Sequence, residues 1–249
     1  MHEPNVTRVL AEIAETDRVL DIGGWARPFN RADYVLDAEP WDTRGFYGSG
    51  RPAQGGDRER FAKERWIRRD ICDHTPYPFP DRFFDYVICS HTLEDVRDPL
   101  WVCAEIMRVG RRGYIEVPSR LAESCRGTEA GQVGWSHHRW LVDIGGTHVR
   151  FLMKYHRIHS HWRFSLPASV LASLQDEQHV QWLFWEDRFT VEEVTIHGVE
   201  NIERELESYV ASVRPYPRWL VTGDAAARRA AGLAGRIRRR AKRWLRPQE

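Results

Sequence analysis

The feature that most constrains the fold is an apolar run that ends in an acid and two glycines, Arg18-Val19-Leu20-Asp21-Ile22-Gly23-Gly24. A second apolar run, Tyr34-Val35-Leu36, ends in Asp37. Glycines let the backbone approach a ligand, and the second acid can accept hydrogen bonds from ribose hydroxyls. The full G-x-G-x-x-G is absent because Trp25 and Arg27 follow. The pattern therefore fits either a nucleoside site or an ordinary turn of an α/β sheet.

Further strands are predicted at 66–71, 84–89 and 113–118, with a helix that Asp98-Pro99 begins and that runs through Met107. The segment FPDRFFDYVICSHTLEDVRDPL is similar to a motif of the class I S-adenosylmethionine (SAM)-dependent methyltransferases, F-D-x-V-x-x-x-H-x-L-E-H-x-x-D-P. The order and spacing of the elements over about residues 15–120 also resembles that family. The chain departs from the motif at Asp95, where the family usually has His.

The resemblance implies an α/β, Rossmann-like fold with a mostly parallel seven-stranded sheet and helices on both faces. The methyltransferase domain is expected at 1–223, with substrate-specific additions at about 120–178 and a basic C-terminal helix at 224–249. Apolar periodicity and turn residues predict the remaining elements. These are helices at 4–16, 58–65, 167–175 and 201–213, a hairpin around Gly145-Gly146, and two antiparallel strands at 180–185 and 191–197 that complete the main sheet. The glycine-rich loop between Asp42 and Glu64 is either a lid or a surface insertion.

The resemblance also implies which residues bind SAM. Asp21, Gly23 and Gly24 are expected at the methionine end, and Asp37 at the ribose. The adenine is expected to meet Asp70 and the backbone of Ile71, and the methionine moiety to lie over Ser90 and His91. Asp70 is also compatible with a simple cap at the end of a strand.

Three histidines are candidates for the general base, His137 and His138 first and His91 next. An unperturbed imidazole has a pKa near ~6.5 and can accept a hydroxyl proton at neutral pH. The alternative is that the His-His-Arg run only holds a loop. Aromatic and basic neighbours are expected to bind the substrate, namely Trp135, Arg139 and Trp140.

A metal ion is a further possibility, with Glu94 and Asp95 as tentative ligands. Mg²⁺ prefers carboxylate oxygens and often bridges to substrate. The alternative is that these acids complement the dipole at the start of a helix.

Composition limits the partners. The net charge is +1, which argues against a nucleic-acid substrate, although 225–246 holds nine Arg and Lys residues. That basic tail is either a solvated helix or an amphipathic contact with a membrane surface. The four cysteines lack C-x-x-C spacing, and no apolar run approaches ~20 residues. A cytoplasmic protein with reduced cysteines is therefore expected, and the 11 tryptophans are compatible with a homodimer.

These observations predict a SAM-dependent O-methyltransferase that acts on a sugar or oligosaccharide hydroxyl. The SHTLED, YIEVPS and HHRW segments also resemble bacterial methyltransferases of polysaccharide biosynthesis, such as a methylmannose polysaccharide pathway. The alternatives are O- or N-methylation of a small natural product, RNA modification, and a non-catalytic SAM-fold scaffold.

Overall fold

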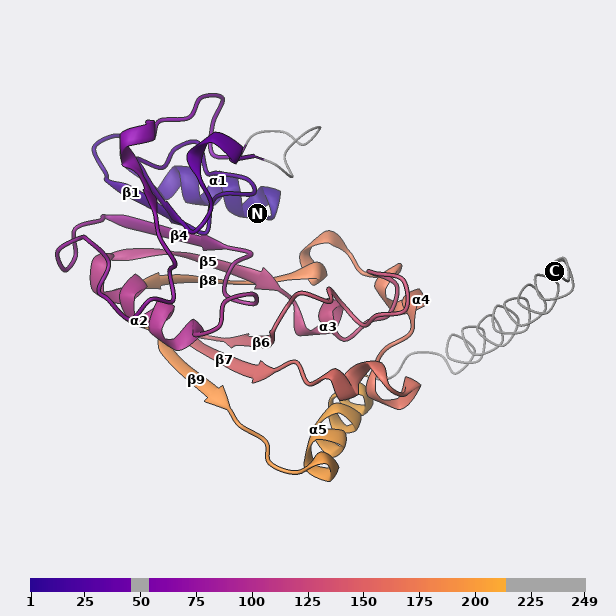
Figure 1. Ribbon diagram of the computed structural model, residues 1–249. Helices are drawn as coiled ribbons and strands as arrows, with labels where there is room; N and C mark the ends of the chain where they lie inside the picture. Colours follow the sequence, from indigo (N-terminus) through magenta and orange to yellow (C-terminus); the bar gives the residue numbers. More distant parts are fainter. Residues whose placement is uncertain (46–53, 214–249) are drawn as a thin grey trace, which may run out of the picture.

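A six-stranded sheet forms the centre of the computed structural model, which describes residues 1–45 and 54–213 (Figure 1). The strand order is β3-β2-β1-β4-β5-β8, with β1 to β5 parallel and β8 antiparallel to β5. The strands are β1 (Val19–Ile22), β2 (Tyr34–Asp37), β3 (Trp66–Arg68), β4 (Tyr86–Ser90), β5 (Arg112–Pro118) and β8 (Val180–Glu186). Their apolar sequences match a sheet that is covered on both faces.

Each face of this sheet has its own apolar layer. Helix α1 (Glu3–Glu12) places Val6 and Val9 against one face, where they share a cluster with Tyr86 and Tyr114. Helix α2 (Pro99–Val109) packs on the other face. It begins as expected, because Asp98 accepts a hydrogen bond from the N–H of Trp101 and Pro99 occupies the first turn. The Rossmann-like α/β class predicted from the sequence is thereby confirmed.

A second, three-stranded sheet lies on the α2 side of the first, in the order β6-β7-β9 (Figure 1). The hairpin of β6 (Trp140–Gly145) and β7 (His148–Met153) confirms the turn predicted at Gly145-Gly146. One face of this sheet contributes Val142 and Phe151 to the main core.

Strand β9 (Thr190–Val194) is the main departure from the expected topology. It runs parallel to β7 in the second sheet, whereas the sequence predicted that it would pair with β8. Asp187 turns the chain with a φ of 57°, and Phe189 is then buried beside Trp185. The main sheet consequently has six strands in the described part of the chain, where seven were expected.

Helix α5 (Val199–Ser212) packs Leu206 under the second sheet and confirms the helix predicted at 201–213. The helix expected at 58–65 is a single 3-10 turn at Lys63–Arg65, and the one expected at 167–175 is one turn of α4 (Ala168–Leu171). A short helix, α3 (Arg120–Glu123), follows β5. Part of the glycine-rich loop, 46–53, and the predicted basic helix lie outside the described residues.

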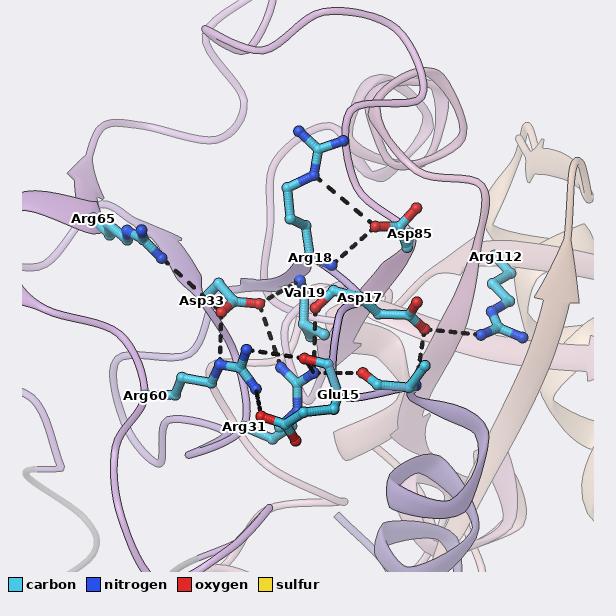
Figure 2. Close-up of polar contacts among 11 residues, drawn as sticks. Glu15, Asp17, Arg18, Val19, Arg31, Asp33, Arg60, Arg65, Asp85 and Arg112 are labelled. Atoms are coloured by element: carbon cyan, nitrogen blue, oxygen red, sulfur yellow. Dashed lines mark hydrogen bonds and ion pairs between the residues drawn. The ribbon is translucent and has the colours of Figure 1, made fainter.

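Charged residues hold the sheet at the amino ends of its strands, opposite the predicted site (Figure 2). The Asp33 carboxylate accepts a hydrogen bond from the backbone N–H of Val19 at 2.9 Å. It also pairs with Arg60 at 2.9 Å and with Arg31 at 3.3 Å. Because Asp33 is 5% exposed, these bonds fix the loop before β2 against the start of β1.

Candidate active site

The carboxyl ends of β1, β2, β4 and β5 meet at one edge of the main sheet because these strands are parallel. Open α/β sheets bind ligands at this edge. Most of the residues predicted from the sequence come from the ends of these strands or from the loops that follow them.

The glycine turn after β1 depends on both of its glycines. Gly23 has a φ of 75°, and a Cβ there would lie 2.1 Å from the Thr92 hydroxyl oxygen. A Cβ on Gly24 would lie 2.2 Å from a carboxylate oxygen of Asp21. Thr92 follows β4, so the turn after β1 and the loop after β4 are packed directly together.

Asp21 supports this turn from below. It is 3% exposed and accepts a hydrogen bond from the backbone N–H of Phe29 at 2.8 Å. Burial raises the pKa of Asp21 to about 7, although that hydrogen bond opposes the shift. Asp21 therefore shapes the loop between Gly24 and Phe29.

Asp37 holds the same loop from the end of β2. Its Oδ2 accepts a hydrogen bond from the N–H of Trp25 at 3.0 Å, and its Oδ1 accepts one from the N–H of Glu39 at 2.8 Å. A carboxylate oxygen can accept more than one donor, so this geometry leaves Asp37 able to bind ribose hydroxyls. Burial raises the pKa of Asp37, and these backbone hydrogen bonds oppose the shift.

The two residues predicted to contact adenine differ in exposure, since Asp70 is half-exposed and Ile71 is buried. Asp70 is half-exposed and pairs with Arg97, which lowers the pKa of its carboxyl group. It also accepts a hydrogen bond from the N–H of Cys72 at 2.9 Å, as a cap would. The side chain of Ile71 is buried in the main core.

His91 follows Ser90, the last residue of β4, and has a φ of 52°. A left-handed backbone is strained for histidine and is often found at functional sites. Its Nε2 lies 3.0 Å from Glu116 and its Nδ1 lies 3.6 Å from Glu94. Burial opposes charging of the ring, but the two carboxylates raise the pKa of His91 to about 9. A ring that is protonated at neutral pH is a poor candidate for the general base.

Glu116 is a buried residue of this site that the sequence reasoning did not identify. Burial would raise its pKa, but His91 and other donors lower it to about 2. These donors include the backbone N–H of His2 at 2.9 Å. The hydroxyl of Tyr114 also donates to Glu116. The available signal was an acid within an otherwise apolar strand, between Ile115 and Val117.

Asp95, His137 and His138 lie together and are called here the acceptor cluster. One potential ligand atom from each lies within 4.8 Å of those of the other two. The cluster joins the loop after β4 to the turn before β6, because the N–H of Arg139 donates to the carbonyl of Glu94 at 2.7 Å. The structure thus brings the two favoured histidines to one of the two predicted metal ligands. The other, Glu94, is 1% exposed and points toward His91.

The histidines of the cluster differ in environment. His137 is 60% exposed, whereas the side chain of His138 is 7% exposed, with Nδ1 3.1 Å from Glu123. Glu123 is itself held by Lys154 at 2.8 Å. Burial opposes charging of His138, but Glu123 raises its pKa. The sequence reasoning did not identify Glu123 and Lys154, which are far from His138 in the chain.

The three predicted substrate residues have different positions. Trp135 is 43% exposed and its ring centroid lies 5.8 Å from that of His137, so it can offer a stacking face. Arg139 is exposed beside the cluster. Trp140 is 8% exposed, and its indole N–H donates to the carbonyl of Val96 at 2.8 Å. The ring of Trp140 therefore packs in the main core, where little of its surface is left to stack on a sugar.

The four cysteines are buried and free, as expected from their spacing.

A hollow of about 270 Å³ lies far from the site and is lined by Asp17, Arg82, Asp85, Arg111, Arg112, Glu186 and Asp187. Its arginines are paired with acids of the same hollow, Arg112 with Asp17 for example. Four acids and three arginines line it, so it presents no net positive charge to an anionic ligand. Within the described ranges, no helix combines the length and apolar character that a membrane span requires.

Residues 54–115 match the methyltransferase domain family. This match holds β3, β4 and α2, which carry the central part of the site. Together with the strand order, it gives this part of the chain the class I methyltransferase fold. No curated protein matches the sequence.

Several solved structures resemble parts of the chain. A putative methyltransferase of Haloferax volcanii, solved with a methyltransferase activator, is 21% identical, with coverage of 47% of this chain and 53% of that one and a TM-score of 0.34. A putative methyltransferase of Bacillus halodurans is 18% identical, with coverage of 47% and 52% and a TM-score of 0.33. A SAM-dependent methyltransferase of Mesorhizobium loti is 15% identical, with coverage of 61% and 62% and a TM-score of 0.34. The chain thus spans between half and two thirds of the length of these structures.

Proposed function

We propose that this protein is a SAM-dependent O-methyltransferase whose acceptor is a hydroxyl of a sugar or oligosaccharide. The observation that carries the proposal is the convergence of the Gly23-Gly24 turn, Asp37 and the acceptor cluster at one sheet edge within a methyltransferase domain. The small natural-product methyltransferase and the scaffold are the alternatives.

The cofactor is expected to lie along the carboxyl edge, from the glycine turn to the loop after β3. Gly23 and Gly24 leave the backbone accessible, while Asp37 accepts ribose hydroxyls with the free capacity of its carboxylate. Ser90 and His91 then lie under the methionine moiety, and the loop after β3, with Asp70 and Ile71, borders the adenine. SAM supplies a methyl group that its sulfonium charge has already activated.

Acceptor binding is assigned to the cluster because the loop after β4 connects it to the glycine turn. Thr92 contacts Gly23 at one end of this loop, and Asp95 belongs to the cluster at the other end. Trp135 offers an exposed ring for stacking on a sugar, and Arg139 is an exposed donor for its hydroxyls. An aromatic face beside polar donors is a common feature of ligand pockets.

The acceptor hydroxyl must lose a proton as its oxygen attacks the methyl carbon. His138 is assigned this role because its buried ring lies at the cluster, with Nδ1 3.1 Å from Glu123 and Nε2 on the side of Asp95. The sugar hydroxyl has a pKa far above that of imidazole. The hydroxyl is therefore activated in one of two alternative ways, by the His138 base when no metal is bound or by a divalent cation beside Asp95 that would act as a Lewis acid.

The acceptor class is tested by incubating the full chain with SAM labelled in its methyl group and separate panels of glycans, phenols and RNA. Label is expected on a saccharide. Transfer only to phenols or RNA would contradict the sugar assignment and leave the methyltransferase standing. The absence of transfer, together with the absence of S-adenosylhomocysteine binding, would favour the scaffold.

The cofactor site is tested by calorimetric binding of S-adenosylhomocysteine to an Asp37→Ala variant. Loss of charge-assisted hydrogen bonds of roughly 1.5–3 kcal/mol should weaken binding about ten-fold or more. Asp42→Ala is the matched control, since Asp42 is an exposed acid just beyond the same strand that pairs with Lys63. Unchanged affinity in a folded Asp37→Ala protein would contradict the assigned site.

A further inference from the structure

We propose that the acceptor cluster of Asp95, His137 and His138 is a binding site for one divalent transition-metal ion. The donor set is two imidazole nitrogens and one carboxylate oxygen. Glu94, which the sequence offered as a ligand with Asp95, is replaced in this set by the two histidines.

The geometry of the cluster fits a single ion. The three ligand atoms lie within 4.8 Å of one another, and His138 Nε2 lies 3.9 Å from Asp95 Oδ1. The rings of His137 and His138 have centroids 4.6 Å apart and planes at 76°. Bonds of about 2.0–2.2 Å to a metal place neighbouring ligand atoms roughly 3–4 Å apart, so side-chain shifts of about 1 Å would close the site.

Unpartnered carboxylate oxygens provide a second, independent observation. Asp95 Oδ1 and Glu94 Oε2 are buried and accept no hydrogen bond from the described residues. The Glu94 side chain is 2% exposed and lies next to Asp95 in the chain. Buried polar atoms are nearly always satisfied, and buried unpaired charge is costly. A cation at the cluster would compensate the negative charge of both acids.

The surroundings of His138 are those of a metal ligand. Its Nδ1 lies 3.1 Å from the buried Glu123, and Lys154 keeps Glu123 in place at 2.8 Å. Nδ1 makes no hydrogen bond with the described residues in this geometry. A small rotation of the ring would let it donate to Glu123, which would fix the tautomer and direct the lone pair of the other nitrogen toward the ion. For His138 that other nitrogen is Nε2, which faces Asp95.

The donor set selects among metals. Imidazole suits Zn²⁺ and other first-row transition metals, whereas Mg²⁺ prefers oxygen ligands and retains its waters. Zn²⁺ and Co²⁺ should therefore bind more tightly than Mg²⁺. The binding site stands by itself, but a role for the ion in holding and polarising the acceptor hydroxyl rests on the proposed function. In the metal-bound state, His138 is a ligand and no longer the general base.

The test is a titration of the metal-free full chain with Co²⁺, followed by the visible absorption of the bound ion, and with Zn²⁺ and Mg²⁺ by calorimetry. One equivalent of Co²⁺ is expected to bind, with Zn²⁺ at least ten-fold tighter than Mg²⁺. His138→Ala, Asp95→Ala and His137→Ala should each weaken Co²⁺ binding ten-fold or more. His156→Ala is the matched control, because His156 is an exposed histidine outside the cluster and should leave binding unchanged.

Thermal unfolding of each variant separates loss of the site from loss of the fold. If His138→Ala does not fold, the Co²⁺ affinity of His137→Ala tests the site, because the side chain of His137 is 60% exposed and its removal should leave the fold intact. Co²⁺ affinity that is the same in folded His137→Ala and Asp95→Ala proteins as in His156→Ala would overturn the proposal. S-adenosylhomocysteine binding is measured on the same samples. Metal binding without nucleoside binding would refute the proposed function and leave the metal site standing.

Discussion

At the sheet edge, burial of a single charged residue can change its pKa and the free energy of unfolding, and the sequence alone does not show this. Asp21 is the clearest case, because it lies under the glycine turn with one backbone donor, and burial raises its pKa to about 7. An acid whose folded-state pKa is raised favours the folded protein when protonated. The contribution of Asp21 to the free energy of unfolding is therefore greatest at low pH. It falls as the pH rises from about 4, where this carboxyl group ionises in the unfolded chain, to about 7, where it ionises in the folded protein.

Asp21→Asn is expected to flatten this pH dependence and to stabilise the protein at pH 8 by a few kcal/mol, since each unit of pKa shift corresponds to about 1.4 kcal/mol. The amide oxygen of Asn can still accept the hydrogen bond from Phe29. The measurement is urea unfolding from pH 4 to pH 8, with the exposed Asp42→Asn as the control. A variant that is less stable than the wild type at pH 8 would show that the charged carboxylate is favoured in the folded state.

At the scale of elements, the turn between β1 and the following loop is the part of the site that tolerates least change. Gly23→Ala adds a Cβ 2.1 Å from the Thr92 hydroxyl oxygen at a φ of 75°. Both the contact and the φ are unfavourable for alanine, so we expect a loss of roughly 1–3 kcal/mol of stability and weaker nucleoside binding.

Gly145→Ala is the matched control for that turn, because a Cβ there would meet nothing within 4 Å. Thermal unfolding and S-adenosylhomocysteine calorimetry on both variants provide the comparison. Equal stability and equal binding of the two proteins would mean that the glycine turn does not constrain the cofactor site.

The elements also differ in how far local sequence predicts them. Strands β1, β2, β4 and β5 and helix α2 were predicted because each is an apolar run with a clear start or stop, such as Asp98-Pro99 for α2. The helix expected at 58–65 was wrong because Phe61 is the one side chain of this polar segment that is buried in the core, and a single apolar residue does not make a helical face. The run at 191–197 was correctly predicted as a strand, but its partner was not, since pairing with β7 depends on contacts distant in sequence.

At the scale of the whole molecule, every residue assigned to the cofactor site and the acceptor cluster lies at or before residue 154. A chain that ends at Asp224 is therefore expected to bind S-adenosylhomocysteine and Co²⁺ with the affinities of the full chain. Calorimetry on the two proteins is the measurement. Loss of nucleoside binding, or unfolding of the shortened chain, would show that the basic segment contributes to the core or to the site.

The order of the strands and the residues that follow them could be predicted from the chain alone, because strand-forming runs and glycine turns are local. The glycine turn and the acid at the end of β2, Asp37, were predicted in this way, whereas the methyltransferase class was predicted from a resemblance to that family. Which charged groups meet was settled by long-range packing. In the folded chain, Glu116 lies beside His91, and Glu123, which Lys154 contacts, lies beside His138. Both cluster histidines lie near Asp95. The same packing buried Trp140. These outcomes depend on segments far apart in the chain, where burial and distance set pKa, exposure and metal-binding geometry.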